Sequence, residues 1–232
     1  MASTILAAVL AVWVNPEVTF WAKLMDGKDR EIGEMDSPKA IFIGGSSCTF
    51  SVDPSIVEEL LTRPSYNYGG SAFMGAKYIF ERVKPHIKKG DLVVVGFEPE
   101  ILMGLGGRKH YPLGYRMAYA NREWKMVSAL RAKKNNFSNW TGALRPGLRN
   151  TVVMLGRKFK GGKDYAYSFE DWAGGGRLEL KKVEYKLAPR GKLDSLDLDS
   201  DAVDFLSEII RYCEEKGAQC VYSIPWQGTE ES

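Results

Sequence analysis

An uninterrupted run of β-branched residues constrains the fold of this chain more than any other feature. Leu92-Val-Val-Val-Gly96 follows a turn at Gly90-Asp91, and such a run is typical of a parallel strand that is covered on both faces. A short apolar run at residues 40–43 and a brief strand at Tyr66-Asn-Tyr68 precede it, and each is followed by a pair of glycines. We therefore expect three neighbouring strands in this part of the chain.

Helical patterns separate the expected strands. Asp53-Pro54 offers an N-cap followed by proline at the first helical position, and apolar spacing over residues 72–83 predicts a second helix. A further helix is expected over residues 200–216, followed by a strand over residues 219–223. This alternation implies right-handed crossovers and a parallel sheet. The predicted fold is a three-layer α/β domain with a flavodoxin-like parallel sheet.

The alternation is lost over residues 101–199, which we interpret as an inserted, cap-like segment with short helices near residues 122–132 and 148–158. Residues 131–192 hold 15 Lys or Arg against 5 Asp or Glu, whereas residues 193–232 hold 2 against 10. Two interpretations remain open for this asymmetry. The first is a solvated surface whose halves compensate each other, and the second is a basic face turned to anionic lipid or acidic polysaccharide.

The N-terminus carries an apolar run over residues 5–14, which Asn15-Pro16 ends. The run is too short to span a bilayer, and no basic residue precedes it. We interpret it as a clipped signal or membrane anchor that belongs to a longer hydrophobic segment in the native gene; the alternative is a buried helix that packs on the domain. The expected organisation is a hydrophobic segment and polar spacer over residues 1–37, then one α/β domain over residues 38–232, in a membrane-anchored or periplasmic protein of the cell envelope.

Ligands of open parallel sheets bind beyond the carboxyl ends of the strands. The loop Gly44-Gly45-Ser46-Ser47 lies at such a position, and its glycines let the backbone turn sharply. This turn could present a serine hydroxyl with amides nearby for a developing oxyanion. The alternative is a glycine-serine turn with no catalytic task.

Three blocks of sequence together resemble the first three blocks of SGNH (GDSL-type) hydrolases: residues 41–54, residues 66–70 and residues 90–96. More narrowly, they are similar to the membrane-anchored, envelope-associated branch whose first block reads Gly-Gly-Ser. The resemblance covers residues 38–100 and extends to residues 200–226. It implies the SGNH fold, Ser46 as nucleophile, and the amides of Ser46 and Gly69 as oxyanion donors.

The third block departs from the family, which usually has an asparagine where this chain has Gly96-Phe-Glu-Pro-Glu100. A carboxylate cannot replace an amide donor unless it is protonated. The family takes its histidine from an Asp-x-x-His motif after the last strand, and no such motif stands before Ser232. We therefore expect a fragment or an inactive relative. The further candidates for binding or orienting a substrate are Ser47, Asn67, Glu98, Glu100 and His110.

The two histidines differ in their expected positions. His110 could reach the site if the insertion folds back, whereas His86 is expected on the surface, far from the strand ends. Two histidines and three cysteines give no zinc-site spacing, so we expect no metal and no cofactor.

The favoured function is a serine-dependent acyl esterase or O-acyltransferase that acts on an ester of an envelope carbohydrate. The alternative is a noncatalytic SGNH-like envelope protein that binds glycan or a protein partner. A net charge of +3 gives no reason to propose a nucleic-acid binder. Gly104-Leu-Gly-Gly107 lacks the spacing of a dinucleotide-binding loop.

Overall fold

A computed structural model describes four stretches of the chain, which are residues 16–102, 112–130, 172–178 and 198–223. Within these residues the main sheet has four strands, all parallel. Their spatial order is β2 (Ser65–Asn67), β1 (Ala40–Gly44), β3 (Leu92–Gly96) and β6 (Gln219–Tyr222). The predicted α/β class with a parallel sheet is confirmed, and the order β2-β1-β3 is that of flavodoxin-like sheets.

The apolar runs found in the sequence form the centre of the sheet. β1 and β3 pair along their whole length, from Ala40 opposite Leu92 to Gly44 opposite Gly96. Their ends at the amino edge are fixed by a fully buried ion pair, in which Lys39 Nζ lies 3.2 Å from Asp91 Oδ2. The two central strands therefore end at the same level, which brings the loops after them together.

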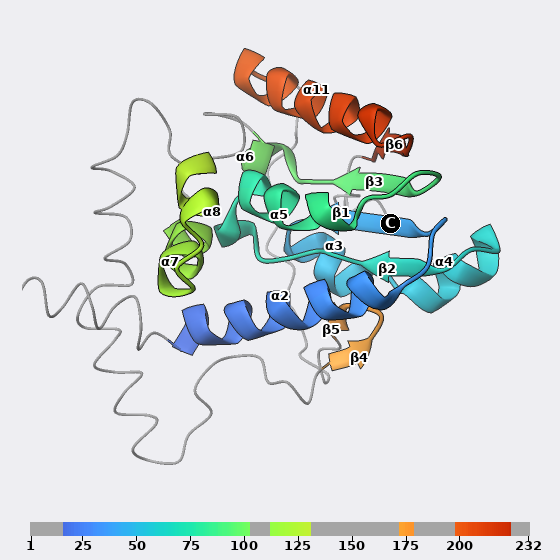
Figure 1. The fold of residues 1–232 in the computed structure, drawn as a ribbon, viewed down its shortest axis with the longest axis horizontal. Helices are drawn as coiled ribbons and strands as arrows, with labels where there is room; N and C mark the ends of the chain where they lie inside the picture. Colours follow the sequence, from blue (N-terminus) through green and yellow to red (C-terminus); the bar gives the residue numbers. More distant parts are fainter. Residues whose placement is uncertain (1–15, 103–111, 131–171, 179–197, 224–232) are drawn as a thin grey trace, which may run out of the picture.

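Helices lie on both sides of this sheet (Figure 1). β2 lies on one side of β1 and β3 lies on the other, so the connections from β1 to β2 and from β2 to β3 run in opposite directions across the sheet. Right-handed crossovers therefore place the connecting helices on opposite faces. The first connection holds α3 (Ser46–Ser51) and α4 (Pro54–Leu61), and the second holds η1 (Ala72–Met74), α5 (Ala76–Val83) and η2 (Lys84–His86). α11 (Ser200–Glu215) lies on the α5 side, where the Phe80 ring packs 6.0 Å from that of Phe205.

The residues expected to form a polar spacer are instead part of the domain. They belong to helix α2 (Pro16–Glu34), whose apolar side chains, among them Trp21, Leu24 and Met25, are buried. Three further helices lie beyond the carboxyl edge of the sheet: α6 (Pro99–Leu102), α7 (Pro112–Ala120) and α8 (Trp124–Ala129). None of the helices in the described stretches is both long enough and apolar enough to cross a bilayer.

The two edges of the sheet differ. At the β2 edge, the turn between β4 (Trp172–Gly174) and β5 (Arg177–Leu178) lies against the strand, because the Asn67 amide donates to the Gly175 carbonyl at 2.9 Å. Gly176 has a φ of 81° and approaches the Asn67 carbonyl so closely that a side chain has no room. At the other edge, β6 leaves Val221 51% exposed.

Coverage of β3 differs from the expectation of a strand buried on both faces. Val93 and Val95 are buried on the α5 side, whereas Leu92 and Val94 on the other face are only half-buried by the described residues. Coverage by α3 and α4 is therefore incomplete over β3 and β6.

Candidate active site

The turn after β1 is too tight for any residue larger than glycine. A Cβ added to Gly44 would lie 2.6 Å from the Gly96 carbonyl oxygen, and one added to Gly45 would collide with the carboxylate of Glu98. Gly45 is the N-cap of α3, so Ser46 is the first residue of this helix. The two glycines thus bring the start of α3 against the end of β3, and Ser46 lies at the carboxyl edge of a central strand.

Ser46 is half-buried, and none of the described residues hydrogen-bonds its hydroxyl. The neighbouring hydroxyl is bound: Ser47 Oγ donates to Glu98 Oε1 at 2.6 Å, and the Ser47 amide donates to the same oxygen at 3.2 Å. The structure thus brings together three residues predicted from two sequence blocks. Ser46 is the one whose hydroxyl remains available to a ligand.

Glu98 is the most unusual polar residue at this edge. Glu98 is only 8% exposed, and its second carboxylate oxygen, Oε2, has no hydrogen-bond partner among the described residues. No described Lys, Arg or His forms an ion pair with it. Buried charges usually have an ion-pair partner or a full set of hydrogen bonds, and this carboxylate has neither within the described residues. Buried polar groups without partners are common in binding and catalytic sites.

The Gly69 loop lies beside α3, as predicted for two loops at the same sheet edge. A Cβ on Gly69 would stand 2.6 Å from the Thr49 amide nitrogen, and Thr49 Oγ1 donates to the Gly70 carbonyl at 2.9 Å. The Gly69 amide itself donates to Asn67 Oδ1 at 2.9 Å. Its predicted task as an oxyanion donor would therefore require that hydrogen bond to be exchanged.

Asn67, predicted to bind or orient a substrate, is completely buried. Its Nδ2 donates to the carbonyls of Cys48 and Val52, at 2.8 and 2.9 Å. These bonds hold α3 against the end of β2, so the buried Asn67 side chain helps to position α3 at the site. Direct contact with a substrate is not compatible with this burial.

Lys28 of α2 belongs to the same region and was missed in the sequence, because α2 was interpreted as a spacer. Its buried ammonium group donates to the carbonyls of Asn67 and Gly69, at 3.0 and 2.6 Å. Burial lowers the pKa of Lys28 to about 7, although Cys48 and Glu31 act in the opposite direction. Burial likewise raises the pKa of the Cys48 thiol to about 12, so this cysteine is protonated at neutral pH and is no nucleophile.

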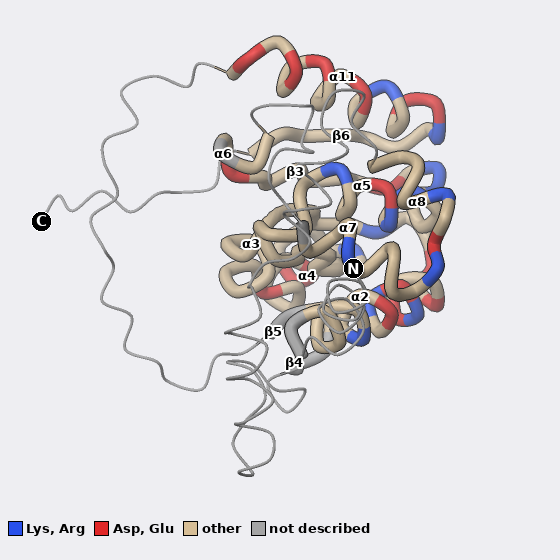
Figure 2. The backbone as a smooth tube through the Cα atoms, turned by 90° about the vertical axis from the view of Figure 1, so that its left-hand side faces the viewer, with Lys and Arg blue, Asp and Glu red and all other residues tan. Residues whose placement is uncertain are grey.

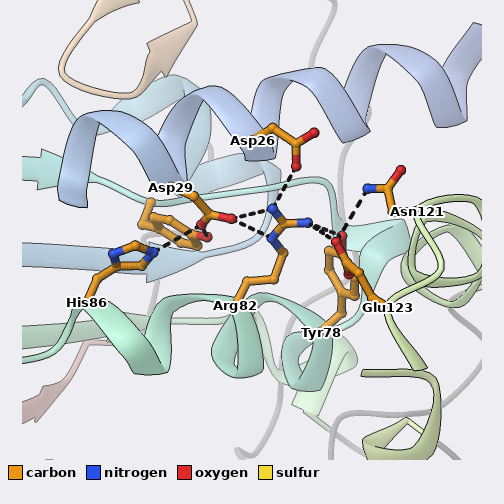
Figure 3. A network of polar contacts seen from close by, with 8 residues as sticks. Asp26, Asp29, Tyr78, Arg82, His86, Asn121 and Glu123 are labelled. Carbon is orange, nitrogen blue, oxygen red and sulfur yellow. Dashed lines mark hydrogen bonds and ion pairs between the residues drawn. The ribbon is translucent and has the colours of Figure 1, made fainter. Parts of the chain in front are cut away.

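No base for Ser46 is found in the described part of the chain. His110 and the side chain of Glu100 lie outside the described residues, so their predicted tasks remain predictions. His86 is half-buried rather than on the surface, and it lies in a different cluster (Figure 3). There its Nε2 is 3.4 Å from Asp29 Oδ1.

Arg82 of α5 lies at the centre of that cluster, which joins three helices (Figure 3). The guanidinium group donates to Asp26 and Asp29 on α2, and at 2.9 Å to Glu123 beside α8. Burial alone would raise the pKa of Asp29, but hydrogen bonding with His86 and the charge of Arg82 outweigh it and lower that pKa. The cluster holds α2 and α8 against α5, and each of its carboxylates is paired with Arg82, although Glu123 Oε2 accepts no hydrogen bond from the described residues.

Comparisons of the chain with protein-family profiles, with curated proteins and with solved structures give no match in any of the three. The geometry of the site offers one available hydroxyl, a second hydroxyl bound to a buried carboxylate, and two glycine turns at the carboxyl edge of a parallel sheet.

Proposed function

We propose that this chain is a serine-dependent acyl esterase or O-acyltransferase of the SGNH kind, and that its substrate is an ester of an envelope carbohydrate. The observation that supports it best is the position of Ser46, which starts a helix at the end of a central strand with no described partner for its hydroxyl. The assignment of Ser46 as nucleophile comes from the resemblance of residues 41–54 to the first SGNH block. The apolar N-terminal sequence favours a location in the cell envelope.

In the proposed reaction, Ser46 Oγ attacks the carbonyl carbon of the ester, and the alcohol oxygen leaves with a proton. Water or a sugar hydroxyl then takes the acyl group from the serine and returns the proton to Oγ. The Ser46 amide stabilises the oxyanion, and Gly69 joins it if Asn67 Oδ1 releases its amide. Glu98 acts as a positioning residue, because it holds the amide and hydroxyl of Ser47 and so fixes the turn.

A serine hydroxyl is a weak nucleophile unless a base accepts its proton, and such a base is typically worth about 100 to 10,000-fold in rate. We therefore expect the 232-residue chain to hydrolyse simple aryl acetates slowly. Replacing His110 by alanine tests whether the insertion supplies a base. Loss of the remaining activity in His110→Ala would identify that histidine as the base.

The test of the nucleophile is covalent labelling followed by rate measurement. A fluorophosphonate should add to Ser46, as mapped by peptide mass spectrometry, and Ser46→Ala should lower the slow aryl-acetate hydrolysis to background. Ser51→Ala, at the exposed end of the same short helix, is the matched control and should leave the rate unchanged. Labelling elsewhere, or robust activity in Ser46→Ala, would show that Ser46 is not the nucleophile.

The second candidate function is a noncatalytic protein that keeps the fold to bind glycan or a partner. It is favoured by the Gly69 amide, which is already bonded to Asn67, and by the lack of a described base near Ser46. In that case acetylated oligosaccharides should bind without turnover, and Ser46→Ala should bind them as the unaltered chain does.

A further inference from the structure

Two of the three cysteines of the chain lie side by side, although they belong to different elements. Cys213 lies in the last turn of α11 and is completely buried, whereas Cys220 lies in β6 and is half-buried. Cys220 is opposite Val93 of β3 in the sheet, and Val93 is buried on the face where α5 and α11 lie. The Cys220 side chain therefore points toward α11, and its thiol is hydrogen-bonded to that of Cys213.

A tight turn sets the spacing between these two elements. The Cys213 carbonyl accepts hydrogen bonds from the amides of Lys216 and Ala218, at 3.1 and 2.8 Å. Gly217, between them, has a φ of 69°, the left-handed conformation that glycine adopts after the end of many helices. Its carbonyl accepts a hydrogen bond from the Gly90 amide at 2.9 Å. Backbone hydrogen bonds therefore hold the last turn of α11 against β6.

Hydrogen bonding makes the two thiols unequal. It lowers the pKa of Cys220, although burial and the charge of Glu214 act in the opposite direction. For Cys213, the same hydrogen bond, burial and the neighbouring charges all raise the pKa. A thiolate rather than a thiol attacks disulfides, so the half-buried Cys220 is the cysteine that reacts first.

The third cysteine is separated from this pair by the sheet. Cys48 belongs to α3, on the opposite face, where its thiol donates to Asn67 Oδ1 at 3.6 Å. It is buried, and its raised pKa keeps it protonated at neutral pH. Cys48 is therefore an internal control, because it should neither react with a disulfide nor find a partner.

The helix that carries Cys213 is acidic. α11 has five acidic residues and one arginine, and Figure 2 shows acidic positions along its length. An anionic compound such as oxidised glutathione is repelled by this charge, whereas an uncharged disulfide is not. The oxidant that fits these surroundings is a small, uncharged disulfide.

We propose that Cys213 and Cys220 form a redox-active pair, which closes to a disulfide when it meets such a compound. The Cys220 thiolate attacks one sulfur of the compound to form a mixed disulfide, and the other half leaves and takes up the proton that Cys220 lost. The Cys213 sulfur then attacks Cys220 Sγ, and the second half leaves with the proton of Cys213. The two cysteines are thereby oxidised by two electrons, and one disulfide is reduced to two thiols.

A disulfide between residues 213 and 220 joins α11 covalently to the last described strand of the sheet. The Tyr222 hydroxyl of the same strand donates to the Phe97 carbonyl at 3.2 Å, directly before Glu98. Oxidation therefore restrains the strand that lies beside the Glu98 turn. The chemistry of the pair does not depend on whether Ser46 is a nucleophile.

Peptide mapping of the oxidised full chain tests the pair. After treatment with 2-hydroxyethyl disulfide at pH 8, the remaining thiols are blocked with N-ethylmaleimide in denaturant. Trypsin cuts after Arg211 and Lys216 and so separates the two cysteines. We expect peptides 212–216 and 217–232 to be joined, and Cys48 to carry the maleimide. A lasting mercaptoethanol adduct on Cys220, a disulfide that includes Cys48, or no reaction would overturn the proposal.

Single variants separate the two steps of the reaction. Cys213→Ala should keep one mercaptoethanol adduct on Cys220, because the thiol that would displace it is gone. Cys220→Ala should stay unmodified, because Cys213 is completely buried. An adduct that forms on Cys213 in Cys220→Ala as fast as on Cys220 in Cys213→Ala would refute the proposed order of attack.

Urea denaturation measures the effect of the closed bond on the fold. Closure of the loop over residues 213–220 should raise the midpoint of unfolding by about 1 M, and dithiothreitol should reverse the shift. Cys213→Ala, treated in the same way, should show no such rise. An unchanged or lower midpoint in a chain that mapping shows to be closed would mean that the bond distorts the native fold, and it would count against a built-in redox pair.

Discussion

Two carboxylates of this domain, the half-buried Asp29 and the buried Glu98, have opposite surroundings. Asp29 accepts hydrogen bonds from Tyr68 and Arg82 and lies beside His86, whereas Glu98 accepts only from Ser47 among the described residues. The Asp29 cluster joins three helices, and Arg82 forms an ion pair with each of its three carboxylates, although Glu123 Oε2 has no hydrogen-bond partner of its own in the described part of the chain. The Glu98 turn joins two strand ends and leaves one carboxylate oxygen and one serine hydroxyl without such partners. The contrast indicates where the fold is held and where a ligand can be received.

The largest expected effect on the free energy of unfolding comes from removing Arg82 from the Asp29 cluster. Arg82→Leu leaves Asp26, Asp29 and Glu123 without their shared cation, and because these acids are partly exposed the loss should be about 2–3 kcal/mol. Urea denaturation should show this loss in the free energy of unfolding. Arg211→Leu removes an exposed arginine that lies 3.9 Å from Glu215, and it should change stability by less than about 0.5 kcal/mol. Equal effects at the two positions would mean that the cluster does not hold the helices.

A smaller effect is expected from the pH dependence of Lys28, which lies between the two regions. Its pKa is about 7 in the folded chain and 10.5 when unfolded. Between these values the unfolded state binds more protons, so this lysine makes stability rise with pH, by at most about 1.4 kcal/mol per pH unit. Below pH 7 both states are protonated and the contribution is constant.

Denaturation between pH 7.5 and pH 9.5 checks this sign. Lys28→Met should abolish the rise relative to the unaltered chain, and Lys23→Met, at an exposed position of the same helix, should keep it. If the free energies of unfolding of Lys28→Met and of the unaltered chain depend on pH in the same way, Lys28 is charged in the folded state at neutral pH. Burial would then not lower its pKa.

A still smaller effect is expected at the Glu98 turn. Glu98→Gln keeps an acceptor for Ser47, so the free energy of unfolding should change by no more than about 1 kcal/mol. Differential scanning calorimetry would measure the change. A loss as large as that of Arg82→Leu would show that Glu98 serves the fold in the same way as the Asp29 cluster.

The smallest effect is expected from Ser46→Ala. Its hydroxyl has no described partner, so the substitution should change stability by less than about 0.5 kcal/mol. Thermal unfolding of the variant beside Ser51→Ala would measure it. A clear destabilisation would mean that Ser46 has a structural task, and it would weaken its assignment as a nucleophile.

The sheet could be predicted from the sequence because its strands are local apolar runs. β3 was expected at Leu92–Gly96 and is found there. Helix α11 was expected after a cap at Ser200-Asp201; it begins at Ser200, and its N-cap is Asp199. Helix α2 was not predicted, because Lys28 and Asp29 appear in a sequence as solvated charges. Only tertiary structure supplies the carbonyls and the arginine that allow them to be buried.

Only part of the candidate site could be predicted, because sequence patterns reveal the strands but not the tertiary contacts between loops. Ser46 and the Gly69 loop follow strands that pair, so their proximity follows from topology. The hydrogen bond between Ser47 and Glu98 spans 51 residues, and its existence depends on a glycine turn whose exact path no periodicity reveals. Burial of Asn67 was equally hidden, since it results from α3 folding back over β2.

The different edges of the main sheet limit how copies of this domain can associate through backbone hydrogen bonds. The turn at Gly175 already occupies the β2 edge at Asn67, whereas no described strand pairs with the outer edge of β6. Within the described residues, the two outer strands therefore differ in how much of their backbone hydrogen-bonding capacity is used. Blocking of an edge strand by a turn is one of the ways in which proteins prevent edge-to-edge association, and the β2 edge has this protection at Asn67.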